Sequence, residues 1–436
     1  MSNNKLGFWA VFALVTGSQI GTGILILPTN LAPFGFLSVV SWAFSIIGVL
    51  SLAMVFANLC RYFPETGGPH IYVERIFGRN AAFFIGWTYW LVSWISSTAV
   101  VIEAMGYLLP LIEINNQFIC LGLEILLLLI ITGLNFRGVQ AAGAAELILV
   151  ALKILPLIIV PIGALFYFNL DNFVIDNSVK DDSNSTNCAK IVLLTIWGFV
   201  GLESATTAAG SVSNPGKIIP RAVIAGTLAV AFLYFTNVLS IMGLIKGSDL
   251  MHSRSPYVDA ARHVFGGQWH LLISIISSIV CIGTLNAWTL VSGQIALGLA
   301  ESSFLPKIFA KKNVNGAPVF AITISTIGII ILLILTANKS MVQQVTAMIN
   351  FSTTSFLFVY LVCAVGLLKF LLTKSEHRSL FKLFTAIVAV IFSLWVIYET
   401  PITTLMIASL FTFSGIPLYL SWYSNGKVTE FSSDKI

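Results

Sequence analysis

Long apolar segments dominate this sequence, and they restrict its fold more than any other feature. About 20 apolar residues allow an α-helix to cross the hydrocarbon core of a bilayer. Because 57% of the residues are hydrophobic and 9% are charged, a water-soluble domain could not cover its surface with polar groups. We therefore expect an all-α membrane protein with about 12 transmembrane helices. The predicted spans lie near residues 8–32, 37–60, 81–109, 117–134, 143–167, 189–210, 221–245, 271–300, 318–336, 343–370, 379–398 and 401–421.

The lysine and arginine residues orient these spans, because cytoplasmic loops carry an excess of them. With both termini in the cytoplasm, sixteen of the 23 lysine and arginine residues fall in inner loops and six in outer loops, while Lys153 lies within a span. The longest outer loop, about 168–188, is polar and acidic and follows the fifth span. It is the natural boundary between two halves of the chain.

Other classes of protein fit the sequence less well. No run of basic residues has aromatic residues interleaved with it, so nucleic acid is not an expected partner. The histidines lack metal-ligand spacing and no G-x-S-x-G or HExxH motif occurs, so no enzyme, catalytic residue, metal or cofactor is predicted. A channel would carry rings of polar or charged residues along its pore. A receptor-type sensor would usually carry an additional soluble domain.

Glycines interrupt the first and the sixth predicted spans. Gly21 and Gly23 flank Thr22 in one, and Gly198 follows Trp197 in the other. Glycine costs about 1 kcal/mol relative to alanine inside a helix, and unwound backbone at membrane depth is tolerated where it lines a cavity. Free N–H groups there attract a carboxylate and free C=O groups an ammonium. One glycine patch alone would favour close helix packing, but corresponding breaks in two halves indicate a transporter with inverted repeats.

Three groups of motifs support this interpretation. They are Gly21-Thr22-Gly23-Ile24 with Leu27-Pro28, Pro64-Glu65-Thr66-Gly67-Gly68 with Tyr72, and residues 197–205 with Asn214-Pro215 and Ile219-Pro220. They resemble the signatures of the amino acid–polyamine–organocation superfamily over essentially the whole chain. Within this superfamily, the sequence resembles the bacterial arginine/agmatine and ornithine/putrescine antiporters.

This resemblance implies a LeuT-type fold, in which five helices are followed by five inverted ones and two peripheral ones. Residues 1–436 would form a single transporter domain, with a first repeat at about 8–167, a second at about 189–370 and peripheral helices at about 379–421. The resemblance also implies a bacterial inner membrane, and a homodimer, which relatives often form through the last two helices.

The resemblance further implies a substrate site at mid-membrane. The substrate carboxylate would meet the backbone around Thr22, and its amino group would meet carbonyls near Ile20 and in residues 197–200. Trp197 would cover the substrate as a gate and Trp288 would stack on its side chain, although membrane tryptophans are otherwise interfacial anchors or packing residues. The predicted substrate-binding residues are Ser18, Ile20, Gly21, Thr22, Gly23, Ser97, Val100, Trp197, Gly198, Val200 and Trp288, and the predicted gating and coupling residues are Tyr89, Lys153 and Glu203.

Three positions depart from the arginine/agmatine antiporter. Ser18 stands where that protein has Asn, and Ser97 and Val100 replace its substrate-contacting Asn and Met. These changes remove contacts to a guanidinium group. They argue against arginine specificity and leave the α-amino-acid end of the site intact.

Ionisable residues inside a membrane are costly and point to function. Lys153 lies where some proton-coupled amino acid carriers of the superfamily place a lysine, in the site that sodium fills in sodium-coupled members. It is predicted either to load and release a proton or to form a static ion pair. His70, after the second span, is either a pH switch or an ordinary loop histidine. The five such residues within spans are Glu103, Glu124, Glu146, Lys153 and Glu203.

The predicted function is secondary active transport, as exchange of an amino acid for an amine. The alternative is proton-coupled amino acid uptake with Lys153 in place of sodium. The expected partners are a small-molecule substrate, either an amino acid or an amine, protons in the alternative mode, and the lipid bilayer.

Overall fold

The protein is almost wholly helical in the computed structural model, which describes residues 5–112, 114, 116–174, 184–253, 255–339 and 341–424. The described residues form no strand, and Leu6 and Val212 make an isolated bridge. Short 3-10 helices cover Ala32–Phe34, Leu109–Ile112, Leu170–Phe173, Ala209–Ser211, Lys307–Ala310 and Ser375–His377. The α-helices are α1 Phe8–Gln19, α2 Thr22–Leu31, α3 Phe36–Tyr62, α4 Pro69–Phe77, α5 Arg79–Leu108, α6 Gln117–Asn135, α7 Val139–Leu165, α8 Asn184–Trp197, α9 Ser204–Thr207, α10 Pro215–Leu244, α11 Gly247–Leu250, α12 Pro256–Phe265, α13 Trp269–Glu301, α14 Val319–Thr336, α15 Met341–Thr373, α16 Leu380–Glu399, α17 Ile402–Phe413 and α18 Ile416–Ser424.

The described helices confirm the all-α membrane fold. Ten are long and apolar enough to cross a membrane, and the pair α1 and α2, bent by 40°, makes an eleventh span when counted as one. The sixth predicted span, 189–210, is divided between α8 and the one-turn helix α9. It does not form one long helix because the backbone turns repeatedly between Gly198 and Glu203.

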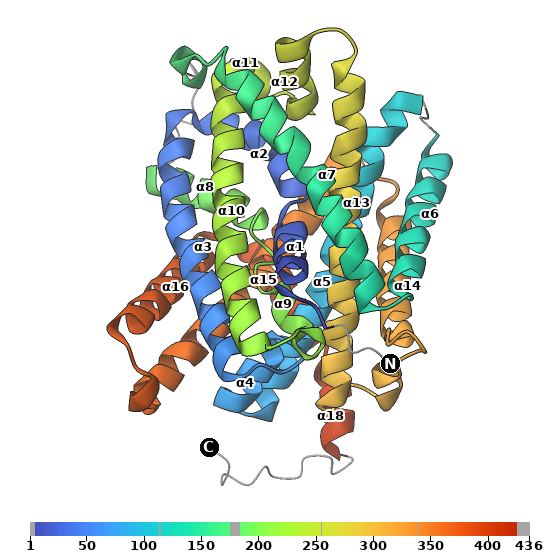
Figure 1. Ribbon diagram of the computed structural model, residues 1–436, viewed down its shortest axis with the longest axis vertical. Helices are drawn as coiled ribbons and strands as arrows, with labels where there is room; N and C mark the ends of the chain where they lie inside the picture. Colours follow the sequence, from blue (N-terminus) through green and yellow to red (C-terminus); the bar gives the residue numbers. More distant parts are fainter. Residues whose placement is uncertain are drawn as a thin grey trace.

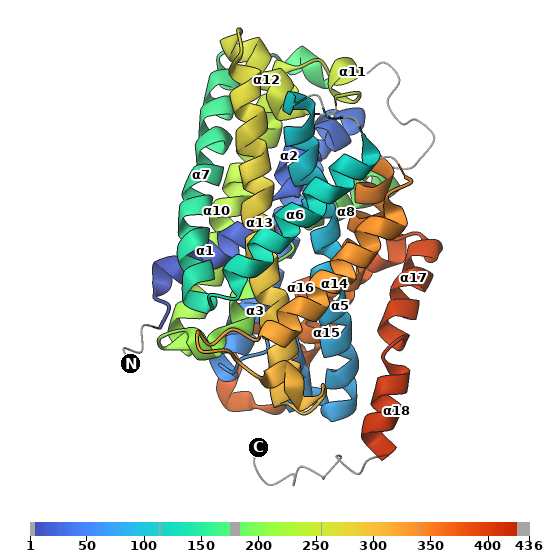
Figure 2. The same ribbon diagram turned by 90° about the vertical axis from the view of Figure 1, so that its right-hand side faces the viewer.

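The loops alternate between two ends of the bundle as the predicted topology requires. Figure 1 shows α4, on the predicted inner side, at the lower end and α11 and α12, on the predicted outer side, at the upper end. Figure 2 shows α18 descending along one edge to that same lower end.

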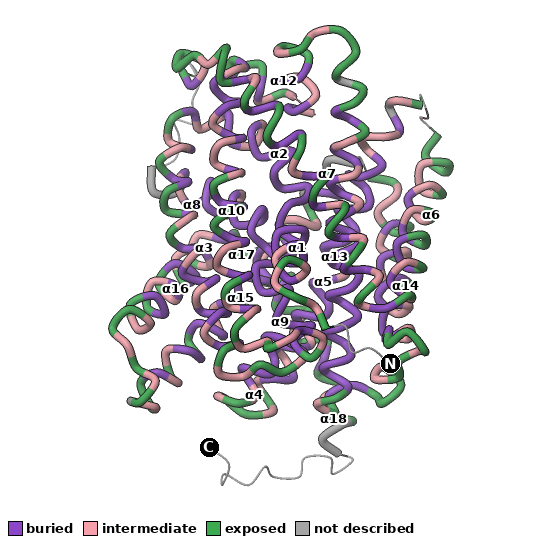
Figure 3. The backbone as a smooth tube through the Cα atoms, in the orientation of Figure 1, coloured by how far each residue is buried: buried purple, intermediate pink, exposed green. Residues whose placement is uncertain are grey.

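Burial follows the pattern of a protein solvated by lipid. Figure 3 shows buried residues concentrated along the bundle axis and exposed ones on the outer helices. In the most apolar stretch of α5 72% of the residues are buried, whereas the corresponding figure for 402–421 is 6%. Large apolar side chains such as Phe232 and Leu410 are exposed. The helices α17 and α18 therefore lie at the edge of the bundle, and the assignment of residues 379–421 as the peripheral helices of a LeuT-type fold stays a prediction.

The broken first helix lies in the middle of this arrangement. Helix α1 packs against α7, α10 and α13, while α5 packs along α13 and α15. The break between α1 and α2 is thus enclosed by protein rather than by lipid, which is where unwound backbone is tolerated. The division into two repeats stays a prediction.

Candidate functional site

The first helix is interrupted where the sequence predicts. Helix α1 ends at Gln19, and Ile20 is extended, with φ −74° and ψ 97°. Gly21, with φ −150° and ψ −143°, precedes α2, whose N-terminus receives no hydrogen bond from a capping side chain. The first amides of a helix have no partner within the helix. The N-terminus of α2 therefore offers N–H groups and a partial positive charge at mid-bundle.

The opposite side of this break is already satisfied by side chains. The last carbonyl groups of a helix lack intrahelical partners. The last three carbonyls of α1 and that of Ile20, the residue after it, each accept a hydrogen bond from α7, α10 or α13. These donors hold the unwound end of the helix in place. The pairs are Lys153 Nζ to Gly17 O at 2.7 Å, Trp288 Nε1 to Ser18 O at 3.2 Å, Tyr234 Oη to Gln19 O at 2.6 Å, and Thr284 Oγ1 to Ile20 O at 2.7 Å.

The second break packs directly on the first. Ser18 Oγ donates to the carbonyl of Gly201 at 3.0 Å. Gly201 has φ +105°, a conformation that other residues rarely adopt. A Cβ atom on Gly23 would lie 2.9 Å from the Cα of Gly198. Two of the glycines that interrupt the helices are therefore also required for their close approach.

A cavity lies between the two breaks. Its volume is about 20 Å³, enough for roughly one water molecule. A substrate could enter this site only if lining side chains moved. The lining residues are Ser18, Gln19, Gly21, Thr22, Gly23, Ser96, Val100, Trp197, Val200, Thr284 and Trp288.

Most of the predicted binding residues line this cavity, and three do not. Ile20, Ser97 and Gly198 are close in the sequence to lining residues but are absent from the lining. Ser96 faces the cavity in place of Ser97, because it lies four residues, about one helical turn, before Val100.

Three lining residues were missed by the sequence reasoning: Gln19, Ser96 and Thr284. Helical periodicity could have found two of them. Ser96 precedes Val100 by four residues and Thr284 precedes Trp288 by four, so each shares a helix face with a predicted binding residue. Gln19 is a buried amide beside the glycine break, which is itself unusual in a membrane helix.

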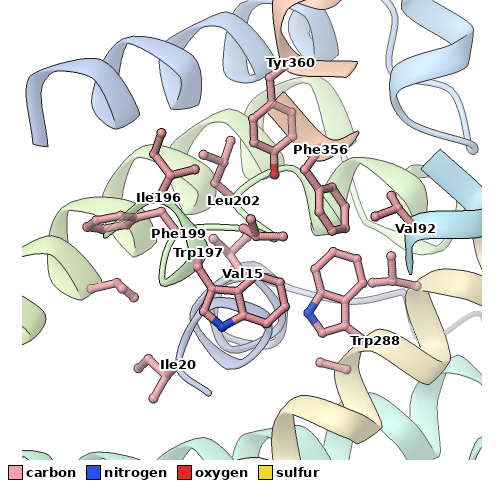
Figure 4. Packing of buried hydrophobic residues seen from close by; sticks show 14 of the residues in the cluster. Val15, Ile20, Val92, Ile196, Trp197, Phe199, Leu202, Trp288, Phe356 and Tyr360 are labelled. Atoms are coloured by element: carbon pink, nitrogen blue, oxygen red, sulfur yellow. The ribbon is translucent and has the colours of Figure 1, made fainter. Parts of the chain in front are cut away.

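Two tryptophans close the cavity. The Nε1 of Trp197 donates to Thr22 Oγ1 at 3.2 Å, and Trp288 is held by its bond to Ser18. The rings of Trp288 and Phe356 have centroids 5.2 Å apart. Figure 4 shows the two indoles facing each other beside α1, with Phe356 next to Trp288. The two indoles are therefore fastened to opposite sides of the break, Trp197 to the first residue of α2 and Trp288 to the end of α1, and opening the site breaks these hydrogen bonds.

Glu203 joins the second break to two long helices. Tyr89 in α5 donates to Glu203 Oε1 at 2.8 Å, and Tyr360 in α15 donates to Oε2. The carboxyl group is fully buried. Tyr360 also accepts a hydrogen bond from the Gly201 amide at 3.3 Å. This cluster fixes the turn between α8 and α9 against the rest of the bundle.

Lys153 forms a second buried cluster on the other side of α1. Besides Gly17, its ammonium contacts Glu146 Oε1 at 3.3 Å and donates to Thr284 Oγ1 at 3.2 Å. A Cβ atom on Gly283 would lie 2.3 Å from Lys153 Cε, so glycine there leaves room for the lysine. The lysine thus joins α7, α1 and α13.

The sequence analysis places His70 in a loop, and the structure corrects this. His70 is the second residue of α4 and is fully buried. The amphipathic helix α4, which the sequence analysis does not predict, forms between the second and third spans and turns this side chain inward. Its ring packs close to the glycines Gly67 and Gly298. Burial lowers the pKa of His70 to about 4, and the neighbouring backbone of Gly298 and Gly67 opposes this only in part.

Comparison with known proteins agrees with this geometry. A family model described as amino acid permease matches residues 6–422. The chain is 28% identical over 420 residues to the putrescine transporter PotE of Haemophilus influenzae, covering 96% of this chain and 97% of that protein. It is 28% identical over 335 residues to the cadaverine/lysine antiporter of Escherichia coli, covering 77% of this chain and 75% of that protein.

Proposed function

The chain belongs to the amino acid permease family, and from this premise we propose that it exchanges an α-amino acid for an amine across a bacterial inner membrane. Two relatives support this proposal: one is named a putrescine transporter and the other a cadaverine/lysine antiporter. The function is transport, with no chemical change to the substrate. The substrate pair is a basic amino acid and the amine formed by its decarboxylation.

The observation that carries this proposal is the uncapped N-terminus of α2, which opens into a buried cavity beside a second broken helix. We assign the substrate carboxylate to the amides around Gly21 and Gly23, with the Thr22 hydroxyl as a further partner. Free amide groups at a helix N-terminus stabilise an anion. The low dielectric of the surrounding protein strengthens that interaction relative to water.

The ammonium group meets carbonyl oxygens on the opposite wall. Because side chains already donate to the carbonyls from Gly17 to Ile20, we assign the remaining acceptor role to the buried turn at 197–200. The Ile20 carbonyl has a second lone pair in addition to the one used by Thr284. The amine lacks the carboxylate and shares this ammonium site with the amino acid, which allows one site to serve both substrates in turn.

Trp197 and Trp288 are assigned as the gate of this site. Substrate entry would exchange their hydrogen bonds to Thr22 and Ser18 for stacking against the substrate side chain. Stacking of a cation on an aromatic ring contributes about 0.5–2 kcal/mol. The hydrogen bond from Tyr89 to Glu203 would hold the turn after Trp197 in place while the gate moves.

Proton-coupled uptake is a second candidate, favoured by the position of Lys153. Its ammonium donates a hydrogen bond to the Gly17 carbonyl near the end of α1. Loss of a proton from Lys153 would therefore remove a positive charge from the broken helix. The pairing with Glu146 equally suits a static cation. Uptake driven by a pH gradient in liposomes distinguishes the modes, and unchanged gradient dependence in Lys153→Ala would exclude the coupling role.

The proposed arrangement in the membrane places both termini in the cytoplasm. The excess of lysine and arginine residues in the predicted inner loops, sixteen against six in the outer ones, supports this orientation. The peripheral helices α17 and α18 expose most of their apolar side chains, and we propose that a homodimer covers part of them.

Exchange is tested with purified protein in liposomes loaded with lysine, ornithine, arginine or the corresponding amines. Uptake of a labelled amino acid is expected only where a partner substrate is inside. A panel of unlabelled amino acids and amines competing for uptake identifies the preferred pair. Equal uptake into empty and loaded liposomes would contradict the exchange proposal.

A further inference from the structure

Glu103 is a buried acidic residue that the proposed transport cycle does not yet use. It lies in α5, three residues and therefore about one helical turn after the cavity-lining residue Val100. Its side chain is 9% exposed. Neither carboxyl oxygen makes a hydrogen bond to any described residue. An ionisable residue inside a membrane without a partner is costly, which marks it as a candidate for function.

The surroundings of Glu103 connect it to the candidate site. The side chain of Thr22 lies beside its carboxyl group. Thr22 lines the cavity and accepts the Trp197 hydrogen bond. Tyr107 in α5 and Cys281 in α13 lie within electrostatic range of the carboxyl group. The carboxyl group therefore sits beside the N-terminus of α2, at the end of the site assigned to the substrate carboxylate.

Among the residues that the structure describes, Glu103 has no counter-ion. Lys153 is paired with Glu146, and two tyrosines donate to Glu203. Thr22, Tyr107 and Cys281 carry no positive charge. An ionised Glu103 would therefore need a cation from outside the protein, because an unpaired buried charge is strongly unfavourable.

Resting on the exchange function proposed above, we infer that Glu103 is the residue that distinguishes the amine from the amino acid, by pairing with an ammonium group of the amine. A basic amino acid brings its own carboxylate to the N-terminus of α2, and a second carboxylate beside it is repulsive. The corresponding diamine lacks that carboxylate and carries one more net positive charge. Glu103 supplies the negative charge that the diamine does not bring.

The test compares ligands that differ by one carboxylate. Binding of lysine and cadaverine, and of ornithine and putrescine, is measured by titration calorimetry on the purified full-length protein and on Glu103→Gln. The variant is expected to bind the diamines at least tenfold more weakly and the amino acids within threefold of the wild-type protein. The control is Glu124→Gln, which changes a buried carboxyl group on α6 outside this cavity. This variant should bind both the diamines and the amino acids with wild-type affinity.

Glu103→Asp provides a second variant if Glu103→Gln does not fold. It keeps the charge and withdraws it by one methylene group, so diamine affinity relative to the amino acid should fall at least threefold. A diamine-to-amino-acid ratio that stays at the wild-type value in a folded variant overturns the role of Glu103 and leaves the exchange function standing. If the wild-type protein binds no member of either pair, both proposals fail.

Discussion

The ammonium of Lys153 donates a 2.7 Å hydrogen bond to the carbonyl oxygen of Gly17. A side chain of α7 thereby caps the point at which α1 unwinds. The same lysine pairs with Glu146, and both side chains are buried. One cation thus serves two structural purposes: it satisfies the end of the broken helix and neutralises a carboxylate in the bundle.

Removal of this cation is predicted to destabilise the protein. Lys153→Ala leaves Glu146 buried and unpaired, which costs about 3–5 kcal/mol. The unfolding temperature of the purified protein in detergent should fall, and the double variant Lys153→Met with Glu146→Gln should recover much of the loss. Arg75→Ala is the control, because the Arg75–Glu65 pair is 46% exposed on both sides and such pairs contribute about 0–1 kcal/mol. Equal effects of the two single variants would contradict this account.

Gly23→Ala is predicted to abolish most exchange. Its Cβ atom would lie 2.9 Å from backbone at Gly198, so α2 and the second break must separate. Uptake into loaded liposomes should fall at least tenfold, a change of about 1.4 kcal/mol or more. Gly133→Ala in α6 is the matched control, since its Cβ atom would meet nothing within 4 Å; it should transport normally and gain helix stability of up to about 1 kcal/mol. Normal exchange by Gly23→Ala would show that the close approach is not required.

Trp197→Phe is predicted to weaken the closed state of the site. An aromatic ring is kept, but the 3.2 Å hydrogen bond to Thr22 is lost, and such a bond contributes about 0.5–1.5 kcal/mol. Because substrate entry no longer has to break this bond, separate measurement of kcat and KM should show a KM lowered several-fold with kcat unchanged or increased. A fall in kcat alone, with KM unchanged, would argue against a gate held by this bond.

The pH dependence of stability should reveal the buried His70. Its folded pKa of about 4 is below its ordinary value of 6.5, so protonation favours the unfolded chain. The stability that this neutral histidine contributes is complete above about pH 6.5 and is lost as the pH falls toward 4, by up to about 3 kcal/mol. His70→Gln should flatten the decline of the unfolding temperature over this range, while the exposed His252→Gln should not.

Because of this low pKa, we do not expect His70 to regulate the exchange rate near neutral pH. Because the ring stays neutral between pH 5 and 8, the exchange rate of His70→Gln should follow the wild-type pH profile over that range. A displaced profile would restore the pH-switch interpretation and contradict the burial of a neutral ring.

The sequence predicts the fold and the position of both breaks because these depend on local features. Apolar length identifies the spans, and glycine beside Thr22 and after Trp197 identifies the interruptions. The partners of the broken helix could not be predicted in this way. That Tyr234 donates to Gln19 and Thr284 to Ile20 depends on how distant helices cross, which residue spacing along one helix does not specify.

The sequence does not specify how each helix is rotated about its axis, and this limits the prediction of individual site residues. The choice between Ser96 and Ser97 depends on which face α5 turns toward the break, and Ser96 is the serine that lines the cavity. Glu103 was recognised as an ionisable residue within a span. Its place beside Thr22 became visible only when α2 and α5 were placed together.

The most direct test of the account is counterflow in liposomes that contain the purified wild-type protein. Labelled lysine or ornithine is presented outside vesicles loaded with the corresponding diamine, with the diamine released measured at the same time. The account predicts uptake and release in a one-to-one ratio, abolished by Gly23→Ala and retained by Gly133→Ala. Uptake into empty vesicles driven by a pH gradient alone, with no release of amine from loaded ones, would contradict exchange as the function.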